Sequence, residues 1–530
     1  MNRSELFGWH LSRRPRSGSL FGWHLFGCAT APVLDSTLFG ASTSPAGVLS
    51  YKVTSGDSAG DSVGTRHSES PAGGGGHSDA TAESKCRVAP YKRKPVESGG
   101  KTSYPRRGPA VRTSPKQPQP RRRRDWYPYH AGYTQQFVDE VLATFAADAT
   151  SVLDPWNGSG TTTAVCFTKG LVTYGIDINP ALTVIARARL TPQSVSESLT
   201  PIGMEIVRAA RRSARPPEPA DPLAAWLHAT SISALRALQS AIHKVLSEID
   251  DCLGPAALGQ QVMSAPLLVA FYYAALFVTT RDLLEPFRTT NPTWLIYPRS
   301  SRGRLRPSET RIVSTFMGRI RYFAGRLSVS GDRSHTGRAA FYTTSATSLP
   351  FSSGELDAVV TSPPYATRID YVMNTLPELA ILGAAPAEIE ALRRCSTGSP
   401  VVEGIWDDLA LTSSKGRVVL DAIRHHSSKG SASYYYPWMT NYLRGLQRGL
   451  SEVSRVVREK GPICVVVQDS YYKEVHIDLQ RIVVETLESR GRRLTDRLDY
   501  GTKHHMARMN PYARRHLSVR NNVESLLVFQ

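Results

Sequence analysis

Apolar runs of strand length alternate with amphipathic stretches along residues 150–190. The runs "SVLD" and "LVTYGID" each lead into a stretch whose apolar residues recur at helical spacing. This strand–helix–strand–helix pattern predicts a βαβ unit and therefore a parallel sheet. Thr161 stands where it would cap the first helix, and Asn179 with Pro180 opens the second.

A second alternation occupies the last part of the chain. The expected elements are a strand within 350–361, an amphipathic helix over 443–457, a buried strand at "ICVVVQDS", a helix at "HIDLQRIVVETLESRG" and a closing strand at "VESLLVF". A further helix is expected within 125–145. Together these segments predict an α/β protein whose doubly wound sheet is interrupted by a long excursion.

Residues 191–340 lack this alternation and are predicted to form a helical inserted subdomain. The longest apolar run of the chain, residues 265–280, lies within it. This run is shorter than the ~20 residues that a membrane-spanning helix needs, and it contains two tyrosines. A buried helix is expected there, and no membrane segment.

Residues 1–124 differ in composition from the rest of the chain. They hold 20 Lys and Arg but only 8 Asp and Glu residues, which accounts for 12 of the 19 net positive charges. A stretch so rich in Gly, Ser, Pro and Arg buries too little apolar surface to offset its ordering entropy, so a disordered basic leader is expected. Such a tail suits a polyanion, and nucleic acid is the usual one; an export signal or a start codon placed too far upstream stay open as alternatives.

Several other polar residues are interpreted without a catalytic role. The six cysteines form no Cys-x-x-Cys pair, which argues against a zinc site or a disulfide framework and fits a reducing cytosol. Cys464 lies inside a predicted strand and is expected in the core. Asp370 and Glu378 are interpreted as solvated loop charges.

A glycine turn follows the first strand in "LDPWNGSGTTT". Gly158 and Gly160 let the backbone pass close beneath a ligand, and the helix start behind them offers free amides. Asp177, at the end of the second strand, is placed to hold both hydroxyls of a ribose. The turn has Thr163 where a dinucleotide site needs a third glycine, and it has no Walker lysine. A carboxylate at Asp154 would repel phosphate but suits a ligand with a positive amino group, and S-adenosylmethionine has one.

A rigid turn, "TSPPY", follows the strand within 350–361. Adjacent prolines fix φ and remove two backbone donors, and the carboxyl end of a strand is where open α/β sheets place their chemistry. In a chain with 35 prolines the turn could also be a chance linker. The preceding strand and the glycine turn favour an active-site turn.

These two motifs resemble those of S-adenosylmethionine-dependent DNA amino-methyltransferases. "DPWNGSGTT" is similar to their DPF-x-G-x-GTT cofactor motif, and "SPPY" is similar to their (D/N/S)PPY tetrapeptide, in which cytosine-N4 members often carry Ser first. The resemblance covers roughly 125–190 and 340–530. It implies a mostly parallel, seven-stranded Rossmann-like methyltransferase sheet, with a cofactor-binding half in 125–190 and a catalytic half in 341–530.

The resemblance also implies roles for individual residues. Ser362 and the carbonyl of Pro363 would accept the hydrogens of an exocyclic amine, Pro364 would stiffen the turn, and Tyr365 would stack on a flipped base. The implied cofactor-binding residues are Asp154, Trp156, Gly158, Gly160, Thr161, Thr162, Asp177, Ile178 and Ser345. Ser345 stands where family members often have Asp, as a contact to the adenine.

The order of the motifs implies how the substrate is recognised. Residues 191–340 lie between the two turns, where one class of the family carries its target-recognition region. The resemblance thus implies a cytoplasmic, site-specific methyltransferase acting on double-stranded DNA, with cytosine N4 favoured over adenine N6 because of Ser362. A partner restriction endonuclease and the oligomeric state stay open. The alternatives are an RNA amino-methyltransferase and a non-catalytic nucleic-acid-binding protein with this fold.

Overall fold

The computed structural model describes residues 111–115, 127, 132–212, 216–247, 253–289, 294–328, 337–402, 410–501 and 523–530. The chain divides into two compact units, and all of these residues belong to the larger one, residues 1–40 and 106–530. Most of the leader at 1–124 lies outside the described residues, so its predicted disorder stays a prediction.

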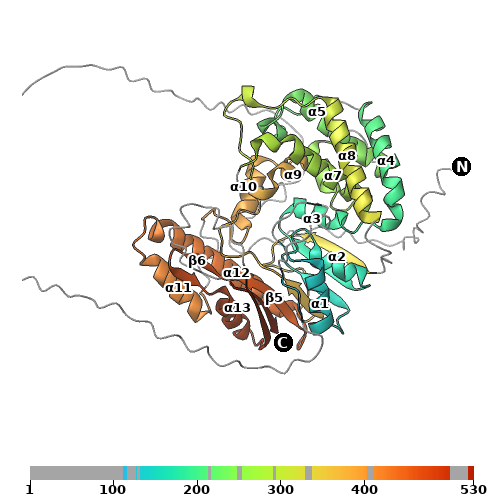
Figure 1. Ribbon diagram of the computed structural model, residues 1–530. Helices are drawn as coiled ribbons and strands as arrows, with labels where there is room; N and C mark the ends of the chain where they lie inside the picture. Colours follow the sequence, from blue (N-terminus) through green and yellow to red (C-terminus); the bar gives the residue numbers. More distant parts are fainter. Residues whose placement is uncertain are drawn as a thin grey trace, which may run out of the picture. The chain divides into compact units, whose positions relative to one another are not determined.

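Seven strands of the described chain form one mixed sheet in the order β3-β2-β1-β4-β5-β9-β8. Figure 1 shows this sheet with its helices. Neighbours from β3 to β5 run parallel, whereas β9 runs antiparallel to both β5 and β8. The strands are β1 Ser151–Asp154, β2 Val172–Asp177, β3 Arg338–Thr343, β4 Ala358–Thr361, β5 Ile463–Gln468, β8 Leu494–Gly501 and β9 Val523–Phe529. A separate hairpin joins β6 (Ser470–Tyr472) to β7 (Val475–Ile477). The α/β class and the mostly parallel seven-stranded sheet are confirmed.

Polar side chains cap two of the described helices, and the start predicted at Asn179 and Pro180 is confirmed. Thr134 caps α1 by accepting a hydrogen bond from the Phe137 amide at 3.2 Å, and Asn179 caps α3 in the same way. The helices are α1 Gln135–Phe145, α2 Thr161–Thr168, α3 Pro180–Ala188, α4 Ser196–Ala210, α5 Ala229–Leu246, α6 Pro255–Gln261, α7 Leu267–Leu283, α8 Glu309–Ser328, α9 Leu376–Ile381, α10 Pro386–Cys395, α11 Ser414–Arg424, α12 Tyr436–Val456 and α13 Leu479–Glu488.

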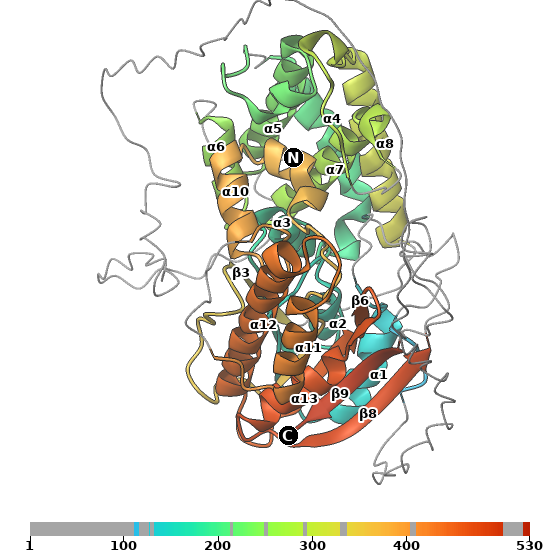
Figure 2. The ribbon, with the colours of Figure 1, turned by 90° about the vertical axis from the view of Figure 1, so that its left-hand side faces the viewer.

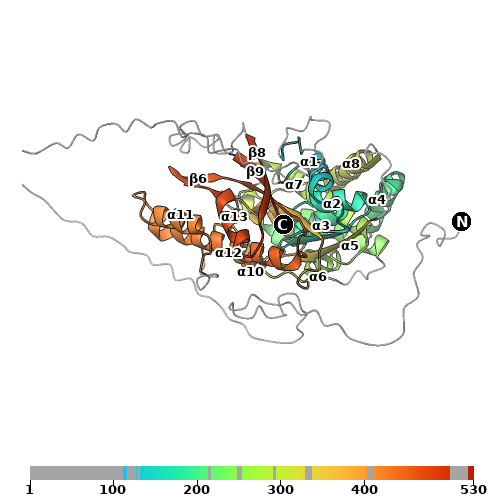
Figure 3. The same ribbon diagram turned by 90° about the horizontal axis from the view of Figure 1, so that it is seen from below.

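Alternate residues of the central strands feed two separate cores. In β4, Ala358 and Val360 pack with α1 and α2, whereas Val359 packs with α12 and α13. Figures 2 and 3 show α13 lying beside both α12 and β9. Because both faces of β4 and β5 are covered, these strands read as unbroken apolar runs, which is why the sequence pattern finds them.

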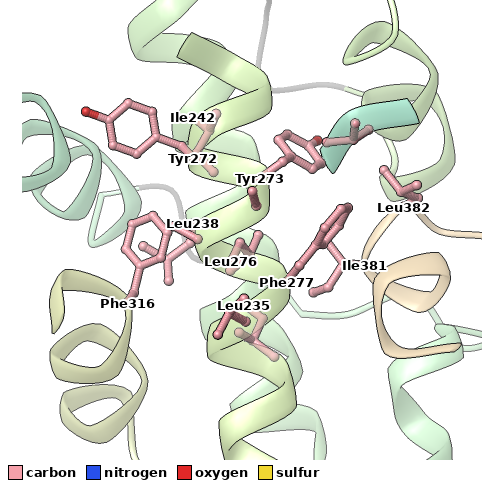
Figure 4. Close-up of a cluster of buried hydrophobic side chains, with 14 of the residues drawn as sticks. Leu235, Leu238, Ile242, Tyr272, Tyr273, Leu276, Phe277, Phe316, Ile381 and Leu382 are labelled. Carbon is pink, nitrogen blue, oxygen red and sulfur yellow. The ribbon is translucent and has the colours of Figure 1, made fainter. Parts of the chain in front are cut away.

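A third core holds the helices inserted between β2 and β3. Its centre is α7, which is buried on almost every side and contacts α3, α5, α8 and α9. Figure 4 shows Tyr272 and Phe277 of α7 reaching toward different neighbouring helices. The buried helix expected at 265–280 is confirmed. Throughout the described residues, every helix is too short or too polar to cross a membrane.

Two sequence-based interpretations are wrong. The boundary of the inserted region at residue 340 cuts through β3, which pairs with β2 along its whole length. This edge strand is partly exposed throughout, so "RAAFYT" lacks the apolar run that marks the central strands. Asp370 and Glu378 are buried, not solvated. Asp370 accepts from Arg393 at 2.9 Å, and Glu378 accepts from Arg281 at 2.9 Å and from the Tyr127 hydroxyl at 2.6 Å.

A buried histidine of the helical core makes stability depend on pH. His243 on α5 lies 2.8 Å from the Tyr273 hydroxyl, and burial lowers the pKa of His243 to about 4. The unfolded chain binds a proton at this residue below a pKa of about 6.5, so unfolding takes up a proton between these pH values. The free energy of unfolding therefore falls as the pH decreases from 7 to 5.

We expect this fall to be about 1–2 kcal/mol smaller in His243→Gln than in the parent, as measured by urea unfolding at pH 7 and pH 5. The exposed His425→Gln should retain the full decrease. If His243→Gln loses as much stability as the parent over this range, the residue is not buried in its neutral form.

Candidate active site

The two predicted turns meet at one edge of the sheet. β1 lies between β2 and β4, so the chain leaves β1 toward one side of the sheet and later returns on the other. The carboxyl ends of β1 and β4 therefore flank a topological switch point, where open α/β sheets bind their ligands. The last residues of β1, β2 and β4 are Asp154, Asp177 and Thr361.

The glycine turn after β1 depends on backbone conformations that favour glycine. Gly158 and Gly160 have φ values of 51° and 79°. A Cβ on Gly160 would lie 2.7 Å from the Cβ of Ala186, so α2 and α3 could not approach as they do. Gly160, not Thr161, is the N-cap of α2, and the cap has no side-chain hydrogen bond. The predicted capping role of Thr161 is wrong; its hydroxyl instead accepts from Arg189 at 3.1 Å.

Asp177 contacts the glycine turn directly. Its Oδ2 accepts from the Gly158 amide and its Oδ1 from the Asn179 amide, both at 2.9 Å. Burial raises the pKa of Asp177 to about 6. A carboxylate has about four lone pairs, so each oxygen can still accept one hydroxyl. This geometry suits the predicted contact with the two ribose hydroxyls.

Asp154 accepts hydrogen bonds from other groups of the protein. Its Oδ1 accepts from Thr361 Oγ1 at 2.7 Å and from the Trp156 amide at 3.2 Å. Its Oδ2 lies 2.7 Å from Thr162 Oγ1 and 3.2 Å from the Tyr133 hydroxyl. These two hydroxyls are 2.5 Å apart, so one of them donates to Asp154 and the other donates to its neighbouring hydroxyl. Burial raises the pKa of Asp154, and these donors oppose that shift. These groups come from four segments, so Asp154 links the four and its lone pairs are mostly occupied by contacts within the protein.

The other predicted cofactor residues differ in their surroundings. The Trp156 ring packs on α12, where a Cβ on Gly449 would lie 2.6 Å from Trp156 Cζ2. Ile178 is partly buried directly after Asp177. Ser345 lies just beyond β3, next to β2 in the sheet, where its Oγ is 2.8 Å from Thr347 Oγ1. The structure thus brings Asp177, Ile178 and Ser345 to the same edge, whereas Trp156 is held by core contacts.

The Ser-Pro-Pro-Tyr turn is fixed by contacts from three elements. The Pro364 carbonyl accepts from the Tyr442 hydroxyl of α12 at 2.8 Å. The Ala366 carbonyl accepts from Ser470 Oγ of β6 at 2.9 Å. The Tyr365 hydroxyl donates to Glu524 Oε1 of β9 at 2.9 Å. Pro363 is buried, and Ser362 and Tyr365 are partly exposed.

An arginine and two tyrosines lie beside this turn. Arg368 has a φ of 55°, unusual for a residue with a side chain. Its guanidinium carbon lies 4.9 Å from the ring centroids of both Tyr434 and Tyr435, and it donates to each hydroxyl at 3.0 Å. The two tyrosines occupy a π-helical turn, a feature frequent at functional sites. We call Arg368, Tyr434 and Tyr435 the cationic platform.

Sequence reasoning did not single out several residues that shape the site. Tyr133 and Thr361 are ordinary residues in the sequence, and only the fold brings them to Asp154. In the platform, Arg368 and Tyr434 are 66 positions apart in the sequence. Glu524 did carry a signal, because it is a charged residue inside the apolar run "VESLLVF".

Sequence comparisons with known proteins found no relative of this chain. No protein-family model matches the chain, and no curated protein matches it.

The role of Asp154 as a link between segments predicts a stability effect. Asp154→Asn would replace one acceptor oxygen by a donor that faces at least one other donor. We expect a decrease of roughly 2–4 kcal/mol in the free energy of unfolding, measured by urea denaturation. Asp148→Asn, an exposed carboxylate just before β1, is the matched control and should change little. Equal effects of the two substitutions would exclude the linking role.

Proposed function

We propose that this protein is an S-adenosylmethionine-dependent methyltransferase that acts on an exocyclic amino group of a DNA base, cytosine N4 in preference to adenine N6. The observation that carries the proposal is the 2.7 Å hydrogen bond from Thr361 to Asp154. It joins the residue that begins the glycine turn to the residue directly before Ser362. The two motifs of the resemblance are thereby parts of one site.

The residues around the glycine turn fit S-adenosylmethionine. Asp177 would accept the ribose hydroxyls, and Ser345, at the end of the neighbouring β3, would face the adenine. Gly158 and Gly160 would leave room for the methionine part close to the backbone. When bound, this cofactor supplies an electrophilic methyl group.

The Ser-Pro-Pro-Tyr turn fits the nucleophile. The lone pair of a base amine is conjugated with the ring, so the nitrogen attacks poorly unless its hydrogens are held out of the ring plane. Ser362 Oγ and the Pro363 carbonyl would accept these hydrogens, and Tyr365 would stack on a base flipped out of the duplex. Positioning and electrostatics then supply most of the rate enhancement. Cys464 is buried within β5 and burial raises the pKa of its thiol to about 12, so it supplies no thiolate nucleophile.

Two positively charged features support a nucleic-acid substrate. Arg368 of the cationic platform is three residues beyond Tyr365. The platform offers both a guanidinium for phosphate and aromatic rings for stacking. The segment 299–311 of the inserted region contains five arginines and is mostly exposed. Phosphate contacts of this kind position a nucleic acid without reading its sequence.

The proposed reaction predicts a product that can be measured. Parent protein incubated with S-adenosylmethionine and unmethylated DNA should form N4-methylcytosine, detected by mass spectrometry after digestion to nucleosides. Ser362→Ala and Tyr365→Ala should lower product formation about 100-fold or more. The matched controls are the exposed Ser353→Ala and Tyr322→Ala, which should keep parental activity.

The base that is modified decides between the alternatives. N6-methyladenine would overturn the cytosine assignment only, and methylation of RNA but not DNA would overturn the DNA assignment. If the protein binds S-adenosylmethionine and modifies neither nucleic acid, the methyltransferase proposal fails.

The pKa of Asp177 predicts how cofactor binding depends on pH. Hydroxyl donors need the ionised carboxylate, and the free protein protonates Asp177 below about pH 6. The affinity for S-adenosylmethionine should therefore fall as the pH drops below 6, by up to about tenfold per pH unit. Asp177→Asn should bind about 10- to 100-fold more weakly at pH 7.5 and lack this dependence. Calorimetric titrations at pH 5 to 8, with Asp148→Asn as control, would detect both effects; a pH-independent parent would exclude this contact.

A further inference from the structure

A buried carboxylate lies behind the Ser-Pro-Pro-Tyr turn. Glu524 is the second residue of β9 and has no exposed surface, although the rest of this strand is almost entirely apolar. Because β9 is antiparallel, its first residues lie at the edge where β5 ends, and Glu524 pairs with Gln468, the last residue of β5. A carboxylate placed here costs free energy unless donors reach it.

The donor that reaches Glu524 comes from the turn. The Tyr365 hydroxyl donates to Glu524 Oε1 at 2.9 Å, and Ser362 Oγ donates to the Tyr365 oxygen at 3.2 Å. An ionised carboxylate can only accept, so Tyr365 must donate to it, and the Tyr365 oxygen is then left to accept from Ser362. The direction of the chain is set by Glu524.

This direction matters for the amine. With its own hydrogen committed to Tyr365, Ser362 Oγ presents lone pairs and no donor to the substrate. A base amine has hydrogens to donate, and it must lose one of them during the reaction. A neutral serine cannot keep that proton, whereas a carboxylate two hydrogen bonds away can.

We propose that Glu524 positions the Ser362–Tyr365 chain and is the final acceptor of the proton lost from the amine; this inference rests on the proposed function. The amine nitrogen forms a bond to the methyl carbon as the bond from that carbon to the sulfonium sulfur breaks. The nitrogen's proton passes to Ser362 Oγ, the serine proton to the Tyr365 oxygen, and the tyrosine proton to Glu524. Glu524 becomes neutral and returns its proton to solvent after the product leaves.

Tyr365 does not stay ionised during this proton transfer. Burial and the charge of Glu524 raise the pKa of Tyr365 well above its ordinary value, so tyrosinate does not accumulate. The proton therefore passes through Tyr365 without a persistent charge on its oxygen. Among the described residues, titratable groups near Glu524 include Tyr500 of β8, Asp469 after β5, and His476, which lies 2.8 Å from Asp469.

The test compares Tyr365→Phe, Glu524→Gln and the double variant in single-turnover methyl transfer at saturating S-adenosylmethionine and DNA. Tyr365→Phe keeps the ring that stacks on the base and removes only the relay. We expect each single variant to be about 10- to 100-fold slower and the double variant to be no slower than the slower single variant. The dissociation constants for cofactor and DNA should stay within about twofold, since neither change touches the binding contacts.

Two further readouts separate this role from a structural one. The pH profile of the methyl-transfer rate should differ from the parental profile in Glu524→Gln, which retains Tyr500, Asp469 and His476. Ser525→Ala alters the next residue of β9, whose hydroxyl donates to Asp499, and should leave the rate unchanged. Tyr365→Phe carries the test by itself if Glu524→Gln does not fold.

The outcomes distinguish a failure of the relay from a failure of the proposed function. Single variants with parental rates would overturn the relay and leave the methyltransferase standing. Multiplicative losses in the double variant would also overturn it, because Glu524 would then act independently of Tyr365. If the parent methylates no nucleic acid, the proposed function fails and the relay falls with it.

Discussion

The site depends on the burial of one carboxylate, that of Asp154. A buried charge persists only where donors satisfy it, and the hydrogen-bonding groups around Asp154 come from the segment before α1, from its own turn, from α2 and from the end of β4. Each of these segments is therefore held at a fixed distance from β1. The glycine turn and the Ser-Pro-Pro-Tyr turn are not merely neighbours on a sheet edge, because they share a hydrogen-bonded centre.

Much of the architecture could be predicted from the sequence, because the central strands have both faces covered and must be apolar throughout. β5 and β9 are mostly apolar runs, with polar residues only at Gln468, Glu524 and Ser525, and the glycines of the first turn are required by positive φ values at Gly158 and Gly160. β3 escaped prediction for the opposite reason. As a partly exposed edge strand, it carries no pattern that distinguishes it from the inserted region before it.

The burial and the partners of the charged residues could not be predicted from the sequence. The sequence does not show whether water or another side chain donates hydrogen bonds to a carboxylate. The partner of Glu378 is Arg281, 97 positions away in the chain. The carboxylate's burial follows from that pairing, which only the fold creates. Asp154 was predicted to face a ligand for the same reason: the sequence shows its position at the strand end but not the donors that already surround it.

The three carboxylates at this edge differ in the donors that surround them. Asp154 is surrounded by hydrogen-bonding groups from four segments and serves to hold the fold. Asp177 accepts two backbone amides and keeps one lone pair on each oxygen. Glu524 accepts a hydroxyl whose own oxygen accepts another hydroxyl, so its charge is felt at Ser362. The same chemical group can thus serve as a structural link, a ligand contact and a proton acceptor within one site, and the local supply of donors decides which.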